Sequence, residues 1–184
     1  MVSGGKLYTA QDLAELAEDG RRFELVDGVL REMSPPTWRH GRITYQISRV
    51  LGNYVEAQDL GEIAVGDPGI ALRRGPDTVR GPDIAFIARQ RLPSAEVDDR
   101  YLDVIPDFIV EVVSSHDSAS EVLEKVEAWL RAGVQLACWV AYPRPRVVIA
   151  YRGLQESRTY REDDEIDAEP VLPGFKAKVG DLFP

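Results

Sequence analysis

Apolar residues recur at helical spacing in two long stretches of the chain. The first stretch predicts an amphipathic helix over residues 38–58 that ends near Gly61. Its apolar stripe consists of Ile43, Ile47, Val50, Leu51 and Tyr54. The second stretch predicts a helix over residues 118–132, closed by Gly133 at its C-terminal end. Its apolar stripe consists of Ala119, Val122, Leu123, Val126, Trp129 and Leu130.

Two local signals organise the N-terminal part. Thr9 followed by Asp12 is typical of a helix N-cap and predicts a short helix through about Ala17. The dipeptide Asp27-Gly28 lies between two apolar runs and is a strong signal for a two-residue β-hairpin. The strands of this hairpin are expected at residues 22–26 and 29–33.

Further strands are predicted where β-branched and aromatic residues cluster between turn residues. They cover residues 62–65, 69–72, 84–88, 108–113 and 135–141, with a hairpin of 146–152 and 156–161 around Gly153. The run 108–113 is apolar enough to be buried on both faces. Segments rich in polar residues, Gly and Pro predict irregular structure: a loop at 74–81, a mobile flap at 90–105, a turn at 162–165 and a tail at 169–184 that packs Val171, Leu172, Phe175 and Leu182 on the body.

This order of elements predicts an α/β (α+β) fold in which a mixed β-sheet is flanked by helices and preceded by a β-hairpin. It is not a regular strand–helix–strand repeat. The chain of 184 residues suits a single domain over 1–184, with its core at about 22–152 and a C-terminal tail at 162–184.

The net charge of −9 argues against broad, sequence-independent attraction to phosphate backbones. It does not exclude a nuclease, because metal-binding carboxylates themselves add negative charge. Two local basic strips could still guide DNA, although scattered solvated arginines are the simpler interpretation of each. The strips consist of Arg73 and Arg74 with Arg80, and of Arg144 with Arg146.

The single cysteine, Cys138, lies in an apolar run and is expected to be a buried small hydrophobe rather than a nucleophile. It leaves no internal disulfide framework and fits a reducing compartment. Residues 1–12 contain no apolar run, and no segment approaches the roughly 20 apolar residues of a membrane helix. We therefore expect a cytoplasmic protein without membrane contact.

Three residues carry the candidate chemistry. Asp83 opens one predicted strand, Glu111 lies in the middle of another, and Lys125 lies on the following helix. A carboxylate in so apolar a strand is costly to bury without a partner. Lys125 is expected at the edge of its helix's apolar stripe, from where it could lean toward Glu111.

Two interpretations of these residues stay open. Carboxylates at adjacent strand ends suit Mg²⁺ or Mn²⁺, which could activate water and offset phosphoryl charge, while a lysine could orient that water. The alternative is a buried Glu111–Lys125 ion pair without catalysis, and spacing alone favours it.

A family resemblance changes that balance. The order Pro82-Asp83, Glu111-x-Val113 and Lys125 resembles the PD-(D/E)xK nuclease core. More narrowly, residues 7–152 resemble the Uma-two family of restriction-endonuclease-like proteins. The matching pieces are 23–28 (FELVDG), 33–36 (MSPP), His40, 81–86 (GPDIAF), 106–114 (PDFIVEVVS), Lys125, 132–134 (AGV) and 139–140 (WV).

The resemblance implies that Asp83 and Glu111 are metal ligands, with Mg²⁺ or Mn²⁺ as cofactor, and that Lys125 is the catalytic lysine. Val113 occupies the usual lysine position of the motif, so the lysine comes from the next helix instead. Glu24 is implied as a further acidic residue near the metal. His40 could contact a phosphate, although a hydrogen bond at a helix start is the simpler role.

The sequence therefore predicts a Mg²⁺-dependent endonuclease that hydrolyses phosphodiester bonds in DNA and acts as a homodimer on two strands. One alternative is a catalytically inactive binding or assembly module with the nuclease fold. Another is an enzyme acting on RNA or a nucleotide, because unrelated activities share folds.

Overall fold

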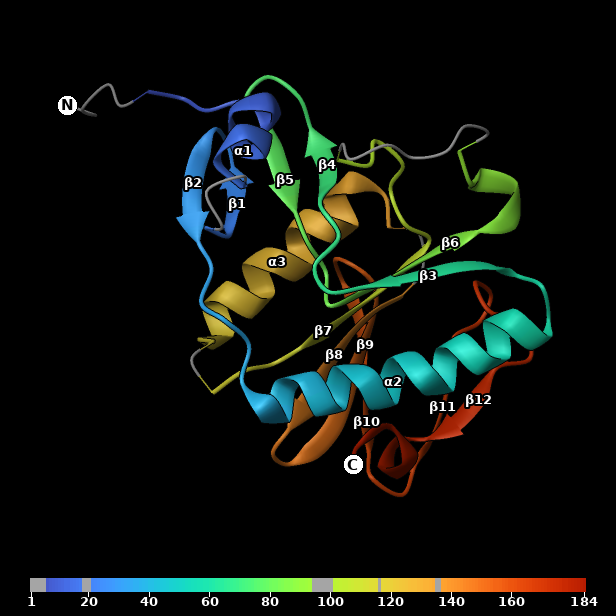
Figure 1. The fold of residues 1–184 in the computed structure, drawn as a ribbon. Coiled ribbons are helices and arrows are strands. Elements are labelled where there is room, and N and C mark those ends of the chain that lie inside the picture. Colours follow the sequence, from blue (N-terminus) through green and yellow to red (C-terminus); the bar gives the residue numbers. More distant parts are fainter. Residues whose placement is uncertain (1–5, 18–20, 94–100, 116, 135–136) are drawn as a thin grey trace.

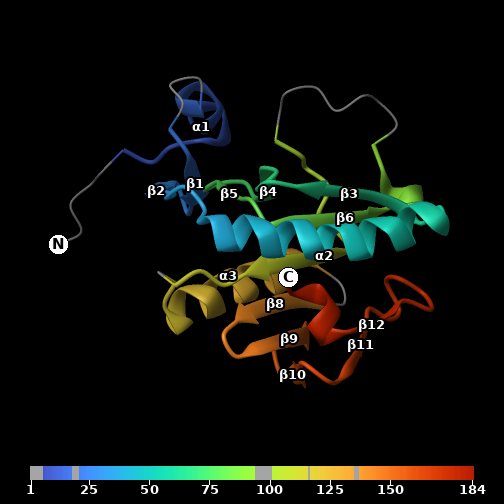
Figure 2. The same ribbon diagram turned by 60° about the horizontal axis from the view of Figure 1, so that its bottom comes forward.

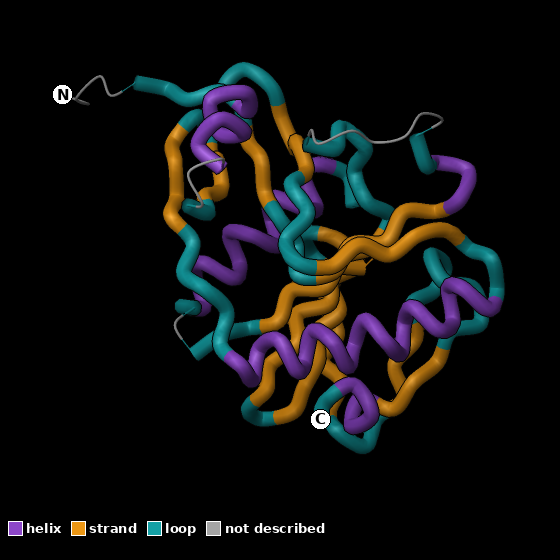
Figure 3. The backbone as a smooth tube through the Cα atoms, viewed as in Figure 1, coloured by secondary structure: helices purple, strands orange, loops and turns teal. Residues whose placement is uncertain are grey.

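The computed structural model describes residues 6–17, 21–93, 101–115, 117–134 and 137–184. Figures 1 and 3 show its helices and strands. Its helices are α1 (Ala10–Ala17), α2 (Trp38–Ala57), α3 (Ala119–Ala132) and the 3₁₀ turns η1 (Arg89–Arg91) and η2 (Val179–Leu182). Its strands are β1 (Phe23–Val26), β2 (Val29–Glu32), β3 (Gly61–Val65), β4 (Ile70–Arg73), β5 (Thr78–Arg80), β6 (Ile84–Ala88), β7 (Phe108–Val112), β8 (Ala137–Pro143), β9 (Arg146–Gly153), β10 (Glu156–Arg161), β11 (Glu165–Asp167) and β12 (Lys176–Lys178).

A six-stranded sheet in the order β10-β9-β8-β7-β6-β3 forms the centre of the molecule. Strands β7 and β8 run parallel and are connected by α3, whereas the other neighbouring strands are antiparallel. The mixed α/β class with flanking helices is thus confirmed. None of the helices in the described part of the chain is long and apolar enough to cross a membrane.

The two faces of the central sheet bury different helices. On one face, Phe108 and Val110 of β7 pack with α2 and the C-terminal segment. On the other face, Ile109 packs with Val126 and Trp129 of α3. The run β7 is therefore buried on both faces, as its composition predicts. Glu111 follows Ile109 by two residues, so the period of a strand places it on the α3 face.

The helix ends follow the local sequence signals. Ser118 and Glu121 form a complete capping box at the start of α3, and Gly133 ends that helix in the left-handed conformation with φ of 101°. Thr37 caps α2 by accepting a hydrogen bond from the backbone N–H of His40. The predicted apolar stripe of α3 is wrong at two positions. Ala119 is exposed and Leu123 is 48% exposed, because the helix buries the face centred on Val122, Val126 and Trp129.

A smaller antiparallel sheet, β2-β1-β5-β4, contains the predicted hairpin. Asp27 and Gly28 both adopt positive φ, as a two-residue hairpin turn requires. Figure 2 shows this sheet at one end of the molecule with α1 beside it. The prediction of a loop over 74–81 is wrong, because Thr78–Arg80 pairs with both β1 and β4 as the buried strand β5. Three residues are too few to show the alternation of apolar and polar positions that identifies a strand in a sequence.

The C-terminal tail is more regular than predicted. Strands β11 and β12 pair with each other, and η2 follows. Leu172, Phe175 and Leu182 are buried against the α2 face of the central sheet, which confirms the expected packing, and Val171 is partly buried there. The predicted flap over 90–105 lies partly outside the described residues; within them, Leu102 bridges to Ile70.

Candidate active site at the β6–β7 strand pair

The register of β6 and β7 brings two carboxylates together. Ile84 pairs with Val110 in antiparallel orientation, so extending the register by one residue places Asp83 across from Glu111. Directly opposed residues have Cβ atoms about 4.5–5.5 Å apart. Both side chains are buried. Two acidic residues that are 28 positions apart in the sequence thus lie side by side at one edge of the α3 face.

Both oxygens of Asp83 are held in place. The backbone N–H of Val112 donates to Oδ2 at 2.7 Å, and Nε2 of His40 lies 3.1 Å from Oδ1. Burial lowers the pKa of His40, but the hydrogen bond to Asp83 and the negative charge of Asp83 outweigh burial and raise it. The contact with His40, together with that from Val112, therefore fixes the orientation of Asp83.

The two carboxylate oxygens of Glu111 have different partners. Its Oε1 accepts a hydrogen bond from the indole N–H of Trp129 at 2.8 Å, whereas Oε2 lies 3.8 Å from Nζ of Lys125. Burial raises the pKa of Glu111 to about 8, against the lowering effect of Lys125. The negative charges of Asp83 and Glu24 add to the rise. Negative charge is thus in excess around Glu111, and a further cation would relieve it.

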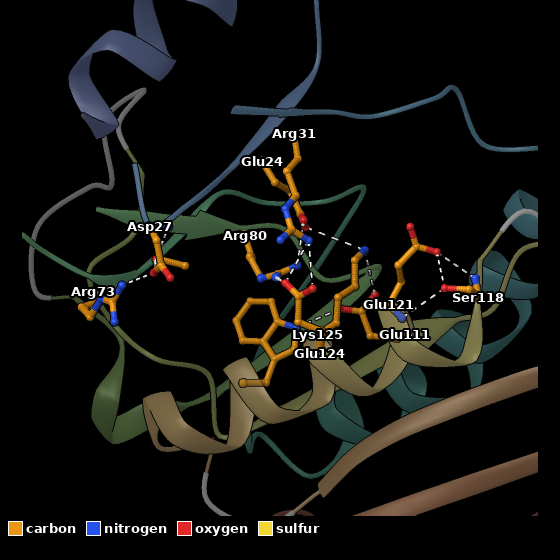
Figure 4. A network of polar contacts seen from close by, with 12 residues as sticks. Glu24, Asp27, Arg31, Arg73, Arg80, Glu111, Ser118, Glu121, Glu124 and Lys125 are labelled. Atoms are coloured by element: carbon orange, nitrogen blue, oxygen red, sulfur yellow. Dashed lines mark hydrogen bonds and ion pairs between the residues drawn. The ribbon is translucent and has the colours of Figure 1, made fainter. Parts of the chain in front are cut away.

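Lys125 extends from α3 toward two carboxylates at once. Its Nζ lies 3.8 Å from Oε2 of Glu111 and 3.8 Å from Oε1 of Glu24 (Figure 4). These distances are too long for direct hydrogen bonds. Burial lowers the pKa of Lys125, but the charges of Glu111, Glu24 and Asp83 outweigh burial and raise it, so the ammonium stays charged. The side chain is 30% exposed, which makes Lys125 the part of the site that opens to solvent.

A second cation, Arg80, holds Glu24 from the other side. Its guanidinium donates to Oε2 of Glu24 at 2.9 Å and to Oε1 of Glu124 at 2.8 Å, as Figure 4 shows. Arg80 is 2% exposed, so the prediction that it belongs to a surface basic strip is wrong. It is buried because β5 is the middle strand between β1 and β4. Oε1 of Glu24 is buried without a hydrogen-bond partner in the described structure.

Asp67 is a site residue that the sequence reasoning missed. It lies in the turn between β3 and β4, with φ of 58°, and pairs with Arg22. Burial and the nearby charge of Asp83 raise the pKa of Asp67, and the positive charge of Lys125 is also close enough to act on it. Gly-Asp-Pro in the sequence signals only a turn, so nothing local marks this aspartate as part of an acidic pocket. We use the name acidic pocket for Asp83, Glu111, Glu24, Asp67 and Lys125.

Two cavities flank the acidic pocket. One has a volume of about 230 Å³ and is lined by Glu24, Asp67 and Arg80 among others. The other, of about 320 Å³, is lined by His40 and by residues at or just after the C-terminal ends of β7 and β8. The first cavity thus reaches Glu24 and Asp67, and the second reaches His40, which contacts Asp83.

The donor set of the acidic pocket fits a small, hard divalent cation. Carboxylate oxygens are the preferred ligands of Mg²⁺, and the hydrogen bonds from Trp129 and Val112 orient them as outer partners orient metal ligands. Among the described residues, no three His, Cys, Asp or Glu side chains come close enough to form a complete cage. Mg²⁺ needs no such cage, because it commonly uses one or two carboxylates and keeps several waters.

The remaining described residues whose side chains could carry chemistry have structural roles. Cys138 is buried, and burial raises the pKa of its thiol, as expected of an unreactive cysteine. Asp107 accepts a hydrogen bond from the backbone N–H of Ala88 and pairs with Arg91. Arg73 and Arg74 pair with neighbouring aspartates at the surface. His116 lies outside the described residues.

Comparisons with known proteins identify a family and a similar fold. The family model "Uma2: Putative restriction endonuclease" matches residues 10–180. The chain is also similar to a solved structure from Anabaena variabilis ATCC 29413, described as "a putative nuclease belonging to DUF820". The two share 20% identity with a TM-score of 0.80, over 95% of this chain and 97% of that chain. This likeness confirms the nuclease-like fold. No curated protein matches the chain.

Proposed function

The chain belongs to the Uma2 family of restriction-endonuclease-like proteins, and on that basis we propose that it is a Mg²⁺-dependent endonuclease that hydrolyses phosphodiester bonds in DNA. The observation that carries this proposal is the placement of Asp83 across from Glu111, with Nζ of Lys125 3.8 Å from Glu111. An isolated ion pair would account for Lys125 and Glu111. It would not account for the second buried carboxylate beside them.

Asp83 and Glu111 would hold the Mg²⁺ or Mn²⁺ ion, which supplies a water of lowered pKa and offsets charge on the phosphoryl group. The hydrogen bond from Trp129 turns Oε1 of Glu111 to one side and leaves Oε2 facing the pocket. Val112 and His40 each contact one oxygen of Asp83 and so hold its carboxylate in place. These donors limit the loss of side-chain freedom when the two carboxylates act together.

Lys125 would orient the attacking water and stabilise negative charge that develops on the phosphoryl oxygens. Its ammonium stays charged because of the surrounding carboxylates, and it is the most solvent-accessible of the three residues. Glu24 would position Lys125: its Oε1 lies 3.8 Å from Nζ, while Oε2 is occupied by Arg80. A direct metal contact by Glu24, which the resemblance implies, would require Oε1 to turn away from Lys125.

His40 would act through Asp83. Its Nε2 already lies 3.1 Å from Oδ1 of Asp83, within hydrogen-bond distance. A phosphate contact by the same nitrogen would therefore require that interaction to break. We therefore assign His40 a positioning role. We also propose that two copies of the chain act together as a homodimer, since two sites are needed to cleave both strands at one place.

The test of this function is cleavage of supercoiled plasmid DNA in Mg²⁺ or Mn²⁺, compared with EDTA. We expect metal-dependent nicking or linearisation by the wild type, and a loss of at least ~10²-fold in Glu111→Gln. Glu127→Gln is the matched control, because Glu127 is a residue of α3 whose side chain is 46% exposed and pairs only with Arg131 in the described structure. Equal cleavage by Glu111→Gln and Glu127→Gln would reject the assigned site.

A second candidate function is a catalytically inactive binding or assembly module. The observation that favours it is the position of Lys125 between Glu24 and Glu111, where the ammonium already compensates buried negative charge. Calorimetric titration with Mn²⁺ separates the two. An endonuclease binds Mn²⁺ as the wild type and loses that binding in Glu111→Ala, whereas an inactive module that relies on Lys125 binds no Mn²⁺ at this site in either protein.

A further inference from the structure

A groove on the other side of His40 has the opposite charge from the acidic pocket. It lies between the start of α2, the turn that connects β8 to β9, and the C-terminal residues, and has a volume of about 610 Å³. The residues that define it are Trp38, Arg39, Arg42 and Arg144, which are all exposed. We call it the arginine–tryptophan groove.

Three of the four arginines that line this groove form no ion pair with any residue that the structure describes. In the described part of the chain, no carboxylate forms an ion pair with Arg39, Arg42 or Arg144. The exposed arginines Arg73, Arg74 and Arg89, by contrast, each pair with an aspartate. A fourth arginine of the groove, Arg146, is already bound to Glu162 and to the carbonyl oxygen of Pro184. In a protein with a net charge of −9, three unpaired arginines at one place form a distinct positive site.

The helix itself adds to the positive charge. Arg39 and Arg42 are in the first turns of α2, whose first turn carries no acidic residue. A helix N-terminus has a positive partial charge, which favours acidic rather than basic neighbours. The arrangement is therefore unfavourable for the isolated protein, and a bound anion would relieve it.

Trp38 supplies a flat apolar surface beside these charges. It is 85% exposed, whereas Trp129 and Trp139 are fully buried. An exposed aromatic ring next to arginines is the combination that binds single-stranded nucleic acids, in which phosphates meet the cations and an unstacked base stacks on the ring. The groove volume lies within the ~300–1,000 Å³ typical of small-molecule pockets, so it suits a few nucleotides rather than a duplex.

The groove is continuous with the candidate active site. The cavity that contains His40 shares Thr37, Arg39, Pro143 and Arg144 with the groove. His40 in turn contacts Asp83 of the acidic pocket. A strand that lies in the groove would therefore lead directly to the acidic pocket.

We propose that the arginine–tryptophan groove binds a single-stranded nucleic-acid segment, with Trp38 stacked on a base and Arg39, Arg42 and Arg144 bound to successive phosphates. This proposal rests on the proposed function, because it names the form of substrate that the same site receives: a phosphodiester next to an unpaired strand, as in a flap, an overhang or an opened duplex.

Binding can be tested without catalysis by titrating the protein with a 12-nucleotide oligothymidylate in EDTA and following tryptophan fluorescence. We expect saturable quenching, because Trp38 is exposed while the other two tryptophans are shielded. Trp38→Phe should abolish the quenching yet retain most of the affinity, measured by anisotropy of a labelled oligonucleotide. Trp38→Ala should weaken the affinity about 10-fold.

The charge contribution is tested with matched triple variants. Arg39→Ala, Arg42→Ala and Arg144→Ala together should weaken binding at least 10-fold. They should also reduce the slope of log K against log salt by about 2, since each phosphate contact on a single strand contributes about 0.7. The control triple, Arg131→Ala, Arg158→Ala and Arg161→Ala, removes three other exposed arginines and the same net charge. It should leave both quantities near the wild-type values.

Three results would overturn the proposal: no quenching at saturating oligonucleotide, equal weakening by the control triple, or equally tight binding of a blunt duplex that does not involve Trp38. A polyglutamate chain that binds as tightly as the oligonucleotide would also reject nucleic acid as the ligand. Because these measurements use EDTA, they are independent of cleavage. Binding without cleavage would reject the nuclease and keep the groove, and cleavage without binding at the groove would do the reverse.

Discussion

The acidic pocket and the arginine–tryptophan groove lie on either side of His40 and carry opposite charges. The pocket gathers buried carboxylates, whereas the groove gathers exposed arginines. In the pocket, buried carboxylates are surrounded by donors from the protein itself: Trp129, Val112 and His40. In the groove, three exposed arginines line one surface without an ion-pair partner among the described residues. The pocket is organised by interactions within the protein, whereas the groove needs an external partner.

This difference implies that the buried charges of the pocket affect mainly the stability of the fold, whereas the exposed charges of the groove affect mainly binding. A buried charge without a partner is costly, so the pocket residues are tied to the stability of the fold. An exposed arginine is hydrated and contributes little to stability. We therefore expect substitutions in the pocket to change the free energy of unfolding, and substitutions in the groove to change ligand binding alone.

The largest expected difference is between the effects of replacing Arg80 and Arg144 on the free energy of unfolding. Arg80→Ala should lower the free energy of unfolding by about 3–5 kcal/mol, because it leaves the buried Glu24 without its main partner. Arg144→Ala should change it by less than about 0.5 kcal/mol. Urea unfolding of both variants measures the two effects. Similar losses for the two arginines would remove the basis of the comparison.

The next effect depends on pH and concerns Glu111. In the unfolded chain its pKa is near the ordinary value of 4.5, whereas burial raises it to about 8 in the fold. The folded protein therefore binds more protons between these values, and stability falls as pH rises through this window. Glu111→Gln removes this loss, so we expect its stability relative to the wild type to increase between pH 5 and pH 8, by on the order of 3 kcal/mol.

This comparison requires EDTA, because a bound cation would itself favour the ionised carboxyl group. Thermal or urea unfolding at several pH values gives the difference directly. A stability difference that is constant from pH 5 to pH 8 would mean that the pKa of Glu111 is not raised in the fold.

A smaller loss of stability is expected for Lys125→Ala. Glu24 keeps Arg80 as a partner, and Glu111 can hold a proton, so neither is left as an unpaired charge. We expect a loss of about 1 kcal/mol in the free energy of unfolding, together with a loss of more than ~10²-fold in cleavage. A loss of several kcal/mol, with no cleavage by the wild type, would favour the inactive module.

The longer buried elements could be predicted from the sequence, because burial over several residues leaves a local pattern. The hairpin at Asp27-Gly28, both long helices and β7 follow from turn residues and apolar periods. A glutamate in the apolar run 108–113 identifies Glu111 as exceptional without any structure. The sequence suggests that Asp83 and Glu111 lie at adjacent strand ends, and the resemblance implies that both bind metal. The register of β6 and β7 places the two residues across from each other.

The parts that could not be predicted depend on contacts distant in sequence. Strand β5 is three residues long, so its burial and that of Arg80 follow only from its place between two other strands. Asp67 reaches the pocket through a turn whose sequence marks no function. The groove combines residues from the start of α2 with residues from the β8–β9 turn, about 105 positions later in the sequence. Isolated surface arginines carry no local sequence pattern that predicts their proximity in the fold.

The central claim is that Asp83 and Glu111 together bind a divalent cation beside Lys125. The most direct test is a crystal soaked in Mn²⁺, with anomalous scattering used to locate the ion. We predict one ion that contacts carboxylate oxygens of both Asp83 and Glu111, at about 2.0–2.2 Å, with waters completing its shell. Absence of an ion between these two residues at saturating Mn²⁺, with Nζ of Lys125 lying there instead, would contradict the account.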